Sequence, residues 1–499
     1  MLWIALTLPN LPLEAIARGS PPPEPLAVAD ARHILACDGR ARHRGVRPGM
    51  TLAAAYALAP QLDVRPRDPA AETETLLGLA AWAGRFTPSV ALDLPDALAL
   101  EVEGSLRIFG GAARIMDAVR RDVAEMGFAP RVACAPTARG ANWLARAGVE
   151  ASIESPAALA DRLATLPLHV TGYDAPTLES LAAIGAATVG DLLALPRDGL
   201  ARRFGQGLLD AVDRALGRLP DPRTFHVPPP TFRATIDLAA EVTQADALVF
   251  AAHRMLVQLE GYLVARSGGV RRFVLRLAHR EGRASEITVG LVAPNRDAAH
   301  LTHLLRERLA GFALPEPVRA LGLAADEIVP VAGESLTLFA EETRGEEDWP
   351  KLVERLRARL GTEAVHGVAT AADHRPERAW RPREPEPRRH ASRTFAGRRA
   401  RRSADEASAT SDIAVSSRPG HRPFWLLAEP RPLAEIDAVP HHGGPLRLLA
   451  GPERIESGWW DGAPCARDYF VARTREDALV WVYRESRDPG GWFLHGMFS

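Results

Sequence analysis

Apolar residues recur with two different spacings along the first 135 residues of the chain. Short apolar runs that end at turn residues predict strands at residues 3–8, 90–94, 97–103 and 131–135. Apolar positions three and four residues apart predict helices at residues 50–58, 72–86 and 110–127. Because helices and strands interleave and some strands form hairpins, this part of the chain indicates an α+β fold rather than a strictly doubly wound sheet.

The pattern changes twice further along the chain. Residues 160–219 are helical almost throughout, with short turns that contain glycine. Residues 231–330 then predict strand, helix, strand, strand, helix and strand, a βαββαβ order that makes a compact four-stranded sheet with two helices on one face. One more helix is expected at residues 352–360.

Composition narrows the class of protein. The chain of 499 residues is 46% hydrophobic and 25% charged, a balance typical of a globular protein with several domains. No apolar run approaches the roughly 20 residues of a membrane span, and the start of the chain does not predict a secretory leader. Cys37, Cys134 and Cys465 lie far apart and form no CxxC pair, so neither disulfides nor a zinc site are predicted. We therefore expect a cytoplasmic protein.

The formal net charge of the whole chain is −1, so overall charge does not indicate whether the protein binds nucleic acid, and only the local distribution of charge can. Between Arg375 and Arg402 there are eleven arginines and three glutamates, a local charge of +8. Few large apolar side chains occur between residues 375 and 420, and this composition predicts a disordered linker. Aromatic content returns after it, since five of the ten tryptophans lie in residues 421–499.

Four motifs, in order along the chain, resemble those of Y-family DNA polymerases. GVRPGM at residues 45–50 resembles the fingers turn, and PDALALEVEG at residues 95–104 resembles the palm strand that carries catalytic acids. The segment 132–148 resembles the palm motif that follows, and residues 178–205 resemble the helix-hairpin-helix pattern of the thumb. The resemblance covers about residues 1–340 and implies a palm with fingers, a helical thumb and a little finger.

The C-terminal sequence is similar to one subfamily, the ImuB-type proteins. The matching motifs are GPERIESGWWDG at 451–462, RDYFVA at 467–472, WVYRE at 481–485 and WFLHGMF at 492–498. This resemblance implies a role in SOS-induced, error-prone translesion synthesis, associated with the nucleoid. It also implies three partners besides DNA: the sliding clamp, a RecA-like accessory protein of the ImuA type, and an error-prone DNA polymerase III alpha subunit.

The resemblance and the composition together divide the chain into seven parts. We expect the architecture of a Y-family polymerase, followed by a linker and a small C-terminal module. The parts are a palm and fingers at 1–155, a helical thumb at 156–222, a little finger at 223–332, a clamp-binding segment at 333–348, a short helical extension at 349–374, an Arg- and Pro-rich disordered linker at 375–420, and an aromatic-rich partner-binding module at 421–499.

The acids needed for nucleotidyl transfer are mostly absent. That reaction uses two metal ions about 4 Å apart, clamped by carboxylates. The family supplies an aspartate on the first palm strand, where this chain has Leu6, give or take one residue, and no acid occurs before Glu14. On the palm hairpin Asp96 matches the aspartate of an Asp-Glu pair, and Ala97 replaces the glutamate. One carboxylate cannot hold two divalent ions, so we predict neither a catalytic nor a metal site.

Three functions remain open at this point. The resemblance favours a non-catalytic hub that binds DNA, clamp and partners. The alternative is an active translesion polymerase in which magnesium is held by Asp96 with Glu101 or Glu103. A DNA-binding structural protein without replication partners is the third, although the clamp motif and the tail argue against it. The simpler role for Asp96 is that of a turn former after Pro95.

Two short segments are candidate contacts for ligands. Arg42 stands where the family has an arginine on the triphosphate, although Gly39 replaces the accompanying tyrosine. ESLTLF at residues 334–339 resembles the bacterial clamp-binding peptide, in which leucine and phenylalanine enter an apolar cleft. A glutamate replaces the usual glutamine at its head. The predicted clamp contacts are Glu334, Leu336, Leu338 and Phe339.

DNA contacts are expected from the second hairpin of the thumb and from one little-finger strand with its turn. The first thumb hairpin is in doubt, because Asp174 stands where the family has glycine and would face phosphate. The predicted DNA-binding residues are Gly185, Thr188, Gly190, Arg266, Arg271, Arg272 and Arg276.

The tryptophans of the tail permit two interpretations. A module of about 80 residues needs an apolar core, and aromatic side chains are also enriched in partner-binding surfaces. The residues predicted to bind partners are Trp459, Trp460, Trp481 and Trp492.

Overall fold

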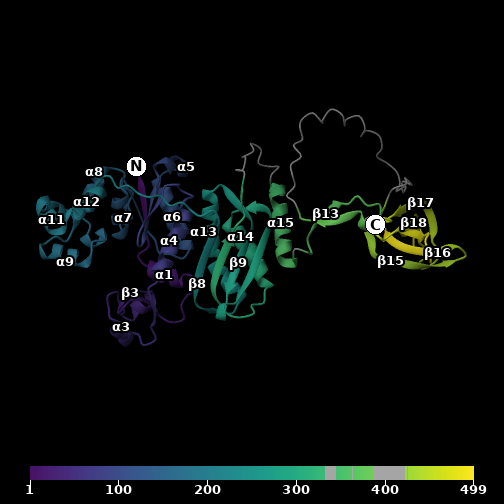
Figure 1. Ribbon diagram of the computed structural model, residues 1–499, viewed down its shortest axis with the longest axis horizontal. Coiled ribbons are helices and arrows are strands. Elements are labelled where there is room, and N and C mark those ends of the chain that lie inside the picture. Colours follow the sequence, from purple (N-terminus) through teal and green to yellow (C-terminus); the bar gives the residue numbers. More distant parts are fainter. Residues whose placement is uncertain (332–343, 362, 386–421, 424, 499) are drawn as a thin grey trace, which may run out of the picture. The chain divides into compact units, whose positions relative to one another are not determined.

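A computed structural model of the protein describes residues 1–331, 344–361, 363–385, 422–423 and 425–498 (Figure 1). The chain forms two compact units, unit 1 at Met1–Ala364 and unit 2 at Val365–Ser499. Among the helices of the described residues, none has the length and apolar character that a membrane span requires. The predicted clamp contacts at residues 334–339 lie outside the described residues.

The predicted palm contains a four-stranded antiparallel sheet with the strand order β5-β6-β1-β7, which is called the palm sheet below. Its strands are β1 (Trp3–Thr7), β5 (Val90–Asp93), β6 (Ala97–Glu101) and β7 (Arg131–Ala135). All four predicted strands of this part are therefore confirmed. Short apolar runs form strands here because both faces of the sheet are buried.

Helices cover both faces of the palm sheet. On one face, Ile4 and Leu6 of β1 join an apolar core that includes residues of α4 (Pro69–Ala83) and α6 (Ala112–Glu125). On the other face, Ala5 packs in the core that surrounds Trp143 of α7 (Ala138–Arg146). The short helix α5 (Leu106–Phe109) precedes α6. Alternate residues of β1 thus enter different cores, as strand geometry requires.

The predicted fingers form a small separate sheet in the order β3-β2-β4. Its strands are β2 (Leu26–Asp30), β3 (His33–Cys37) and β4 (Asp63–Pro66). The helices of this part are α1 (Leu11–Ala17), α2 (Gly39–His43) and α3 (Leu52–Leu58). The apolar pattern predicts only the last of these elements. The three strands and α2 are four or five residues long, too short to show a clear period.

The predicted thumb is helical, as expected. It consists of α8 (Pro156–Ala164), α9 (Ala175–Ala183), α10 (Val189–Ala194), α11 (Arg197–Phe204) and α12 (Gln206–Ala215). Leucines and valines of these helices share one core with Trp143 of α7, which fixes the thumb against the palm sheet.

The predicted little finger is a βαββαβ unit, which confirms the sequence prediction. Its strands are β8 (Phe232–Val242), β9 (Gly268–Ala278), β10 (Ala284–Asn295), β11 (Val318–Ala325) and β12 (Ile328–Pro330), so the last predicted strand is divided in two. The sheet order is β10-β9-β11-β8, and β12 also pairs with β9. Two long helices, α13 (Ala245–Ala265) and α14 (Ala298–Ala310), pack together beside this sheet.

Palm and little finger share one apolar core, because α13 packs directly on α4. Small residues permit the close approach of the two helices. A Cβ atom at Gly261 of α13 would lie 2.0 Å from Cδ1 of Trp82 on α4. Trp82 is itself fully buried. The helix α15 (Arg344–Leu360) is longer than the predicted helix and packs on α14 and β10.

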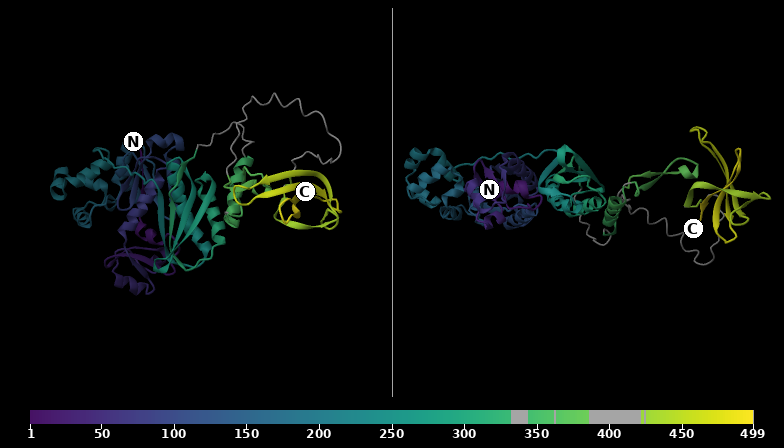
Figure 2. Two further views of the ribbon diagram at one scale, coloured as in Figure 1. Left: turned by 45° about the vertical axis from the view of Figure 1, so that its right-hand side comes forward. Right: turned by 90° about the horizontal axis from the view of Figure 1, so that it is seen from below.

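Unit 2 contains a six-stranded antiparallel sheet in the order β16-β15-β20-β19-β18-β17, whose strands curve around its core (Figure 2). These strands are β15 (Trp425–Ile436), β16 (Val439–His441), β17 (Arg447–Ser457), β18 (Cys465–Arg473), β19 (Leu479–Glu485) and β20 (Gly491–Met497). A hairpin of β13 (Gly367–Thr370) and β14 (Trp380–Arg383) precedes them.

The start of unit 2 corrects two predicted boundaries. The predicted helical extension at 349–374 spans both units, and the predicted linker begins too early, because Trp380–Arg383 form a strand. Arg375 is only 2% exposed, and its guanidinium donates to Asp373 Oδ2 at 2.7 Å and Asp461 Oδ2 at 2.6 Å. An arginine-rich composition does not reveal that one arginine is buried between two acids.

Candidate functional site

The register of the palm sheet places the residues expected at a polymerase site. Thr7 lies opposite Ala97, and Leu6 lies opposite Leu98. Residues directly opposite each other point to the same face of a sheet. Leu6 is fully buried in the core on the other face, so the residue that shares a face with Ala97 is Thr7. Thr7 lies within the one-residue uncertainty of the position predicted at Leu6.

Asp96, in the turn before β6, has a cationic partner. Nη2 of Arg146, the last residue of α7, donates to Asp96 Oδ1 at 2.7 Å. The main-chain oxygen of Asp96 accepts from the N–H of Leu8 at 2.9 Å, which holds the turn at the end of β1. The side chains of Arg146 and Asp96 are 22% and 30% exposed. Asp96 is thus more than a turn former, because a guanidinium neutralises its carboxylate.

A second carboxylate of this region, Asp93 at the end of β5, is also neutralised. Arg223 Nη1 lies 3.1 Å from Asp93 Oδ1, and Asn142 Nδ2 donates to Asp93 Oδ2 at 2.8 Å. Arg223 bonds Asp221 Oδ2 at 2.6 Å as well. Sequence reasoning missed Asp93 because its partners lie about 50 and 130 residues further along the chain.

The acids of the alternative active enzyme are too far apart to clamp a metal pair. Glu101 follows Asp96 by five positions along β6, which corresponds to about 16 Å of strand. A two-metal site needs its ions only about 4 Å apart. Glu103 Oε2 is paired with the N-terminal ammonium group at 2.8 Å. Within the described parts of the chain, no three His, Cys, Asp or Glu side chains are grouped so that they could hold a metal ion.

Arg42, the predicted triphosphate contact, lies on α2 in the fingers. Its Nε donates to the main-chain oxygen of Cys37 at 3.0 Å, and its Nη2 donates to Asn10 Oδ1 at 3.3 Å. Asn10 follows β1 by three residues, so Arg42 lies near the carboxyl end of that strand. The triphosphate contact stays a prediction.

Two main-chain N–H groups of the second thumb hairpin donate to a side chain of the same hairpin. Gly185 has a φ of +85°, which favours glycine, and the turn leads to Thr188 at the N-cap of α10. Asp191 Oδ2 accepts from the N–H groups of Ala187 at 3.1 Å and Thr188 at 2.9 Å. The hydrogen bond from Thr188 holds the pKa of Asp191 below its usual value. These two N–H groups are therefore already occupied.

Two further thumb residues have structural roles. A Cβ atom at Gly190 would lie 2.8 Å from the main-chain oxygen of Ala164, so Gly190 permits α10 to pack closely on α8. Asp174 caps α9 by accepting from the N–H of Thr177 at 3.2 Å. Packing against α8 is thus the reason for the glycine at position 190.

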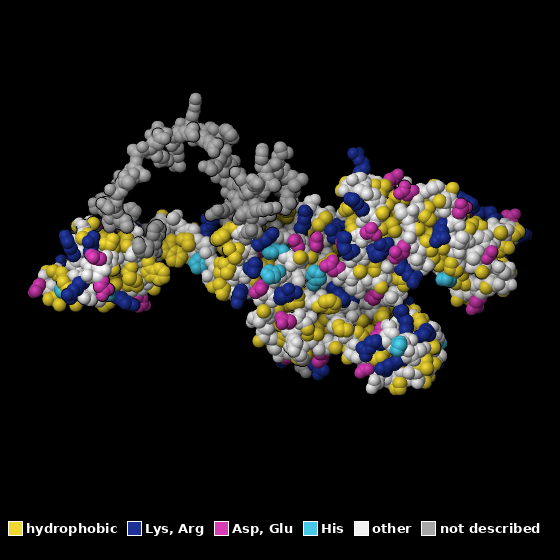
Figure 3. All heavy atoms as spheres, turned by 180° about the vertical axis from the view of Figure 1, so that it is seen from behind, with side chains coloured by type: hydrophobic (Ala, Val, Ile, Leu, Met, Phe, Trp, Pro, Cys, Tyr) yellow, Lys and Arg dark blue, Asp and Glu magenta, His cyan; other side chains and the backbone are white. Residues whose placement is uncertain are grey.

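The four little-finger arginines have different surroundings. Arg266 Nη2 donates to the main-chain oxygens of Pro228 and Pro229, at 3.0 and 2.6 Å, and so holds the segment before β8. Arg276 is paired across strands with Glu286 at 2.8 Å. The other two, Arg271 and Arg272, are exposed and have no partner among the described residues. On the face of unit 1 shown in Figure 3, basic and acidic side chains are interspersed.

The four tail tryptophans divide into two pairs. Trp481 and Trp492 are 2% and 6% exposed and belong to the core of unit 2, so the prediction that they contact partners is wrong. Trp459 and Trp460 are 81% and 56% exposed. The guanidinium of Arg375 lies 5.8 Å from the ring centre of Trp460, and the ion pairs of Arg375 with Asp461 hold the same loop.

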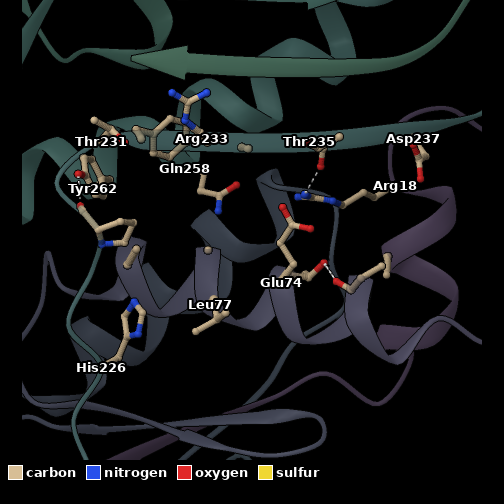
Figure 4. Close-up of a pocket in the computed structure, with 18 residues that line it drawn as sticks. Arg18, Glu74, Leu77, His226, Thr231, Arg233, Thr235, Asp237, Gln258 and Tyr262 are labelled. Atoms are coloured by element: carbon tan, nitrogen blue, oxygen red, sulfur yellow. Dashed lines mark hydrogen bonds between the residues drawn. The ribbon is translucent and has the colours of Figure 1, made fainter. Parts of the chain in front are cut away.

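A pocket of about 280 Å³ lies where α1 and α4 meet β8 and α13 (Figure 4). Arg18 Nη2 donates to the main-chain oxygen of Thr235 at 3.4 Å, and burial lowers the pKa of Arg18 to about 10. Gln258 is 5% exposed, and its Oε1 has no hydrogen-bond partner among the described residues. Sequence reasoning missed this pocket, because its walls come from segments more than 200 residues apart.

Known proteins resemble this chain as follows. The impB/mucB/samB family model matches residues 20–146. Protein ImuB of Caulobacter vibrioides (strain NA1000 / CB15N) is 30% identical over 484 residues, which cover 91% of this chain and 100% of that protein. DNA polymerase IV of Shewanella baltica (strain OS195) is 32% identical over 195 residues, 37% of this chain and 53% of that polymerase. The crystal structure of DinB from Sulfolobus solfataricus covers 66% of this chain at 15% identity, with a TM-score of 0.33.

A four-stranded palm sheet, a helical thumb and a βαββαβ little finger, in this order, are the architecture of a Y-family DNA polymerase. The similarity to the Caulobacter protein covers that protein from end to end. The chain belongs to the ImuB family.

Proposed function

We propose that this protein acts in SOS-induced, error-prone translesion synthesis as a hub that binds DNA and replication partners, and does not itself catalyse nucleotidyl transfer. The ion pair between Asp96 and Arg146 carries this proposal. A guanidinium 2.7 Å from the one matching carboxylate repels a divalent cation at that place. The acids expected on the same face are replaced by Thr7 and Ala97, so the residues present do not fit magnesium.

The full-length protein is expected to extend no primer with four dNTPs and magnesium or manganese. Each missing metal-clamping group costs several kcal/mol of transition-state stabilisation, or about a thousandfold in rate. Gel-resolved primer extension measures this, with the DNA polymerase IV of Shewanella baltica as the active control. Extension that disappears in an Asp96→Ala variant would show that Asp96 does hold a catalytic metal.

DNA binding is proposed to depend on Arg271 and Arg272, because these arginines have no acidic partner among the described residues. We expect Arg272→Ala to reduce the slope of log affinity against log salt by about one unit. Arg276→Ala is the matched control and should change the slope less, because Glu286 already neutralises Arg276. Fluorescence anisotropy of a labelled primer-template between about 50 and 200 mM salt measures both slopes. Equal slopes for the two variants would refute the assignment.

Clamp binding is proposed for residues 334–339 on the strength of their sequence. Leu338→Ala and Phe339→Ala together are expected to weaken binding to the bacterial sliding clamp at least about tenfold, because both anchors lose apolar contact area. Thr337→Ala changes a polar neighbour in the same segment and serves as the control. Surface plasmon resonance on immobilised clamp reports the affinities. The proposal fails if the double variant binds as tightly as the control.

The remaining partners are proposed to contact unit 2. An ImuA-type accessory protein and an error-prone DNA polymerase III alpha subunit are the candidates that the family resemblance implies. Trp459 and Trp460 are the suitable contact residues, because both are exposed and their loop is held by the buried Arg375. A place in the cytoplasm near the nucleoid follows from the DNA-bound role.

A further inference from the structure

The outward face of helix α15 carries a stripe of large apolar side chains. Trp349, Leu352, Leu356 and Leu360 are spaced three or four residues apart and therefore lie on one face of the helix. They are 47%, 48%, 39% and 58% exposed. A surface helix usually turns such a stripe towards the core of its protein.

The opposite side of α15 is firmly attached to the little finger (Figure 1). Val353 and Glu354 are 4% and 3% exposed. Glu354 Oε1 accepts from the N–H groups of Val292 at 2.8 Å and Ala293 at 3.3 Å, and its Oε2 lies 2.7 Å from Nε2 of His300. A buried carboxylate with three partners is costly to release, so the helix cannot rotate to bury its leucines.

The exposed charges that α15 itself contributes beside this stripe are positive among its described side chains, although Glu286 and Glu307 lie near its end at Leu360. Lys351, Arg355 and Arg359 follow one another at steps of four residues, next to the leucines, and all three are exposed. None of them has an ion-pair partner among the described residues. Among the described side chains of α15, Glu354 is the one acid, and it faces inwards. Between Trp349 and Leu360, the outward side of α15 is therefore apolar and carries positive charges.

We propose that this face of α15 docks an acidic amphipathic helix of a protein partner. Such a helix would lay its apolar side on the leucines and its carboxylates beside the three cations. The phosphates of DNA would neutralise the cations, but the DNA backbone would leave the four apolar side chains of the stripe exposed to water. The proposal goes beyond the hub function, which assigns no role to α15, and it does not depend on the absence of catalysis.

The test uses the full-length protein and two fluorescent synthetic peptides. One peptide is an 18-residue helix with leucines on one side and glutamates flanking them, and the other has lysine at each glutamate position. We expect binding of the acidic peptide alone. Leu352→Glu with Leu356→Glu should weaken it at least about tenfold. Ile108→Glu is the matched control, because Ile108 is an exposed apolar residue of α5, 81% exposed.

Reversing the charges on α15 distinguishes this specific docking from non-specific hydrophobic binding. Arg355→Glu with Arg359→Glu should reverse the preference, so that the lysine peptide binds and the glutamate peptide does not. Thermal unfolding of each variant confirms that its fold is intact. Equal binding of both peptides, or no binding of the acidic one, would overturn the proposal. So would an affinity for phosphatidylglycerol vesicles that depends on Leu352 and Leu356 while the acidic peptide is ignored, because the face would then serve a membrane.

Discussion

Replacing Glu14 by glutamine is expected to stabilise the protein by roughly 2–3 kcal/mol at pH 8 and to have little effect at pH 4. Burial raises the pKa of Glu14 from 4.5 to about 7, although the N–H of Ala129 donates to its Oε1 at 3.0 Å. Its second oxygen, Oε2, is buried and has no partner among the described residues. Folding therefore favours the protonated carboxyl.

The sign of the pH dependence follows from this raised pKa. Between pH 4.5 and 7 the folded protein holds a proton at Glu14 that the unfolded chain has lost, so stability falls as pH rises through this window. Glutamine cannot ionise and removes this loss. Urea unfolding at half-unit steps of pH measures the effect. Glu179→Gln, an exposed carboxylate on α9, removes the same charge without burial, and an identical gain in that control would exclude burial as the cause.

Replacing Gly261 by alanine is expected to destabilise the joined palm and little finger by about 2 kcal/mol. The new Cβ would lie 2.0 Å from Cδ1 of Trp82, a fully buried ring, so the ring or one of the two helices would have to shift. The loss exceeds the gain of up to about 1 kcal/mol that alanine brings to a helix interior.

Gly199 on α11 provides the matched control for this substitution. A Cβ atom at Gly199 would meet nothing within 4 Å, so Gly199→Ala should show the helix gain alone. Thermal unfolding of both variants gives the comparison. A Gly261→Ala protein that is as stable as Gly199→Ala would mean that α4 and α13 are not packed as tightly as described.

Much of the fold follows from local patterns in the sequence. The strands of the palm sheet are short apolar runs, and in the little finger apolar positions recur with the spacings of strands and helices; the predicted order of these elements is confirmed. The fingers sheet was not predictable in this way, because β2 and β4 are short and contain few large apolar residues. The true start of unit 2 was hidden as well, since burial of Arg375 depends on Asp461, 86 residues later.

The candidate site was predictable only in part. Motif spacing identified Asp96 and Ala97, but the register that brings Thr7 opposite Ala97 is a property of the folded sheet. The partner of Asp96 is Arg146, 50 residues away, and no local pattern connects them. The tail shows the same limit, because Trp481 is buried and Trp459 is exposed although both lie in matching motifs.

The ion pair between Arg146 and Asp96 also constrains how this lineage can evolve. A metal-dependent palm would need acids at positions 7 and 97 together with removal of the guanidinium at position 146. None of these substitutions alone would supply the carboxylates that hold two metal ions. Under the proposed non-catalytic function, a metal-dependent palm would therefore need substitutions at all three positions, 7, 97 and 146, within an unchanged palm sheet.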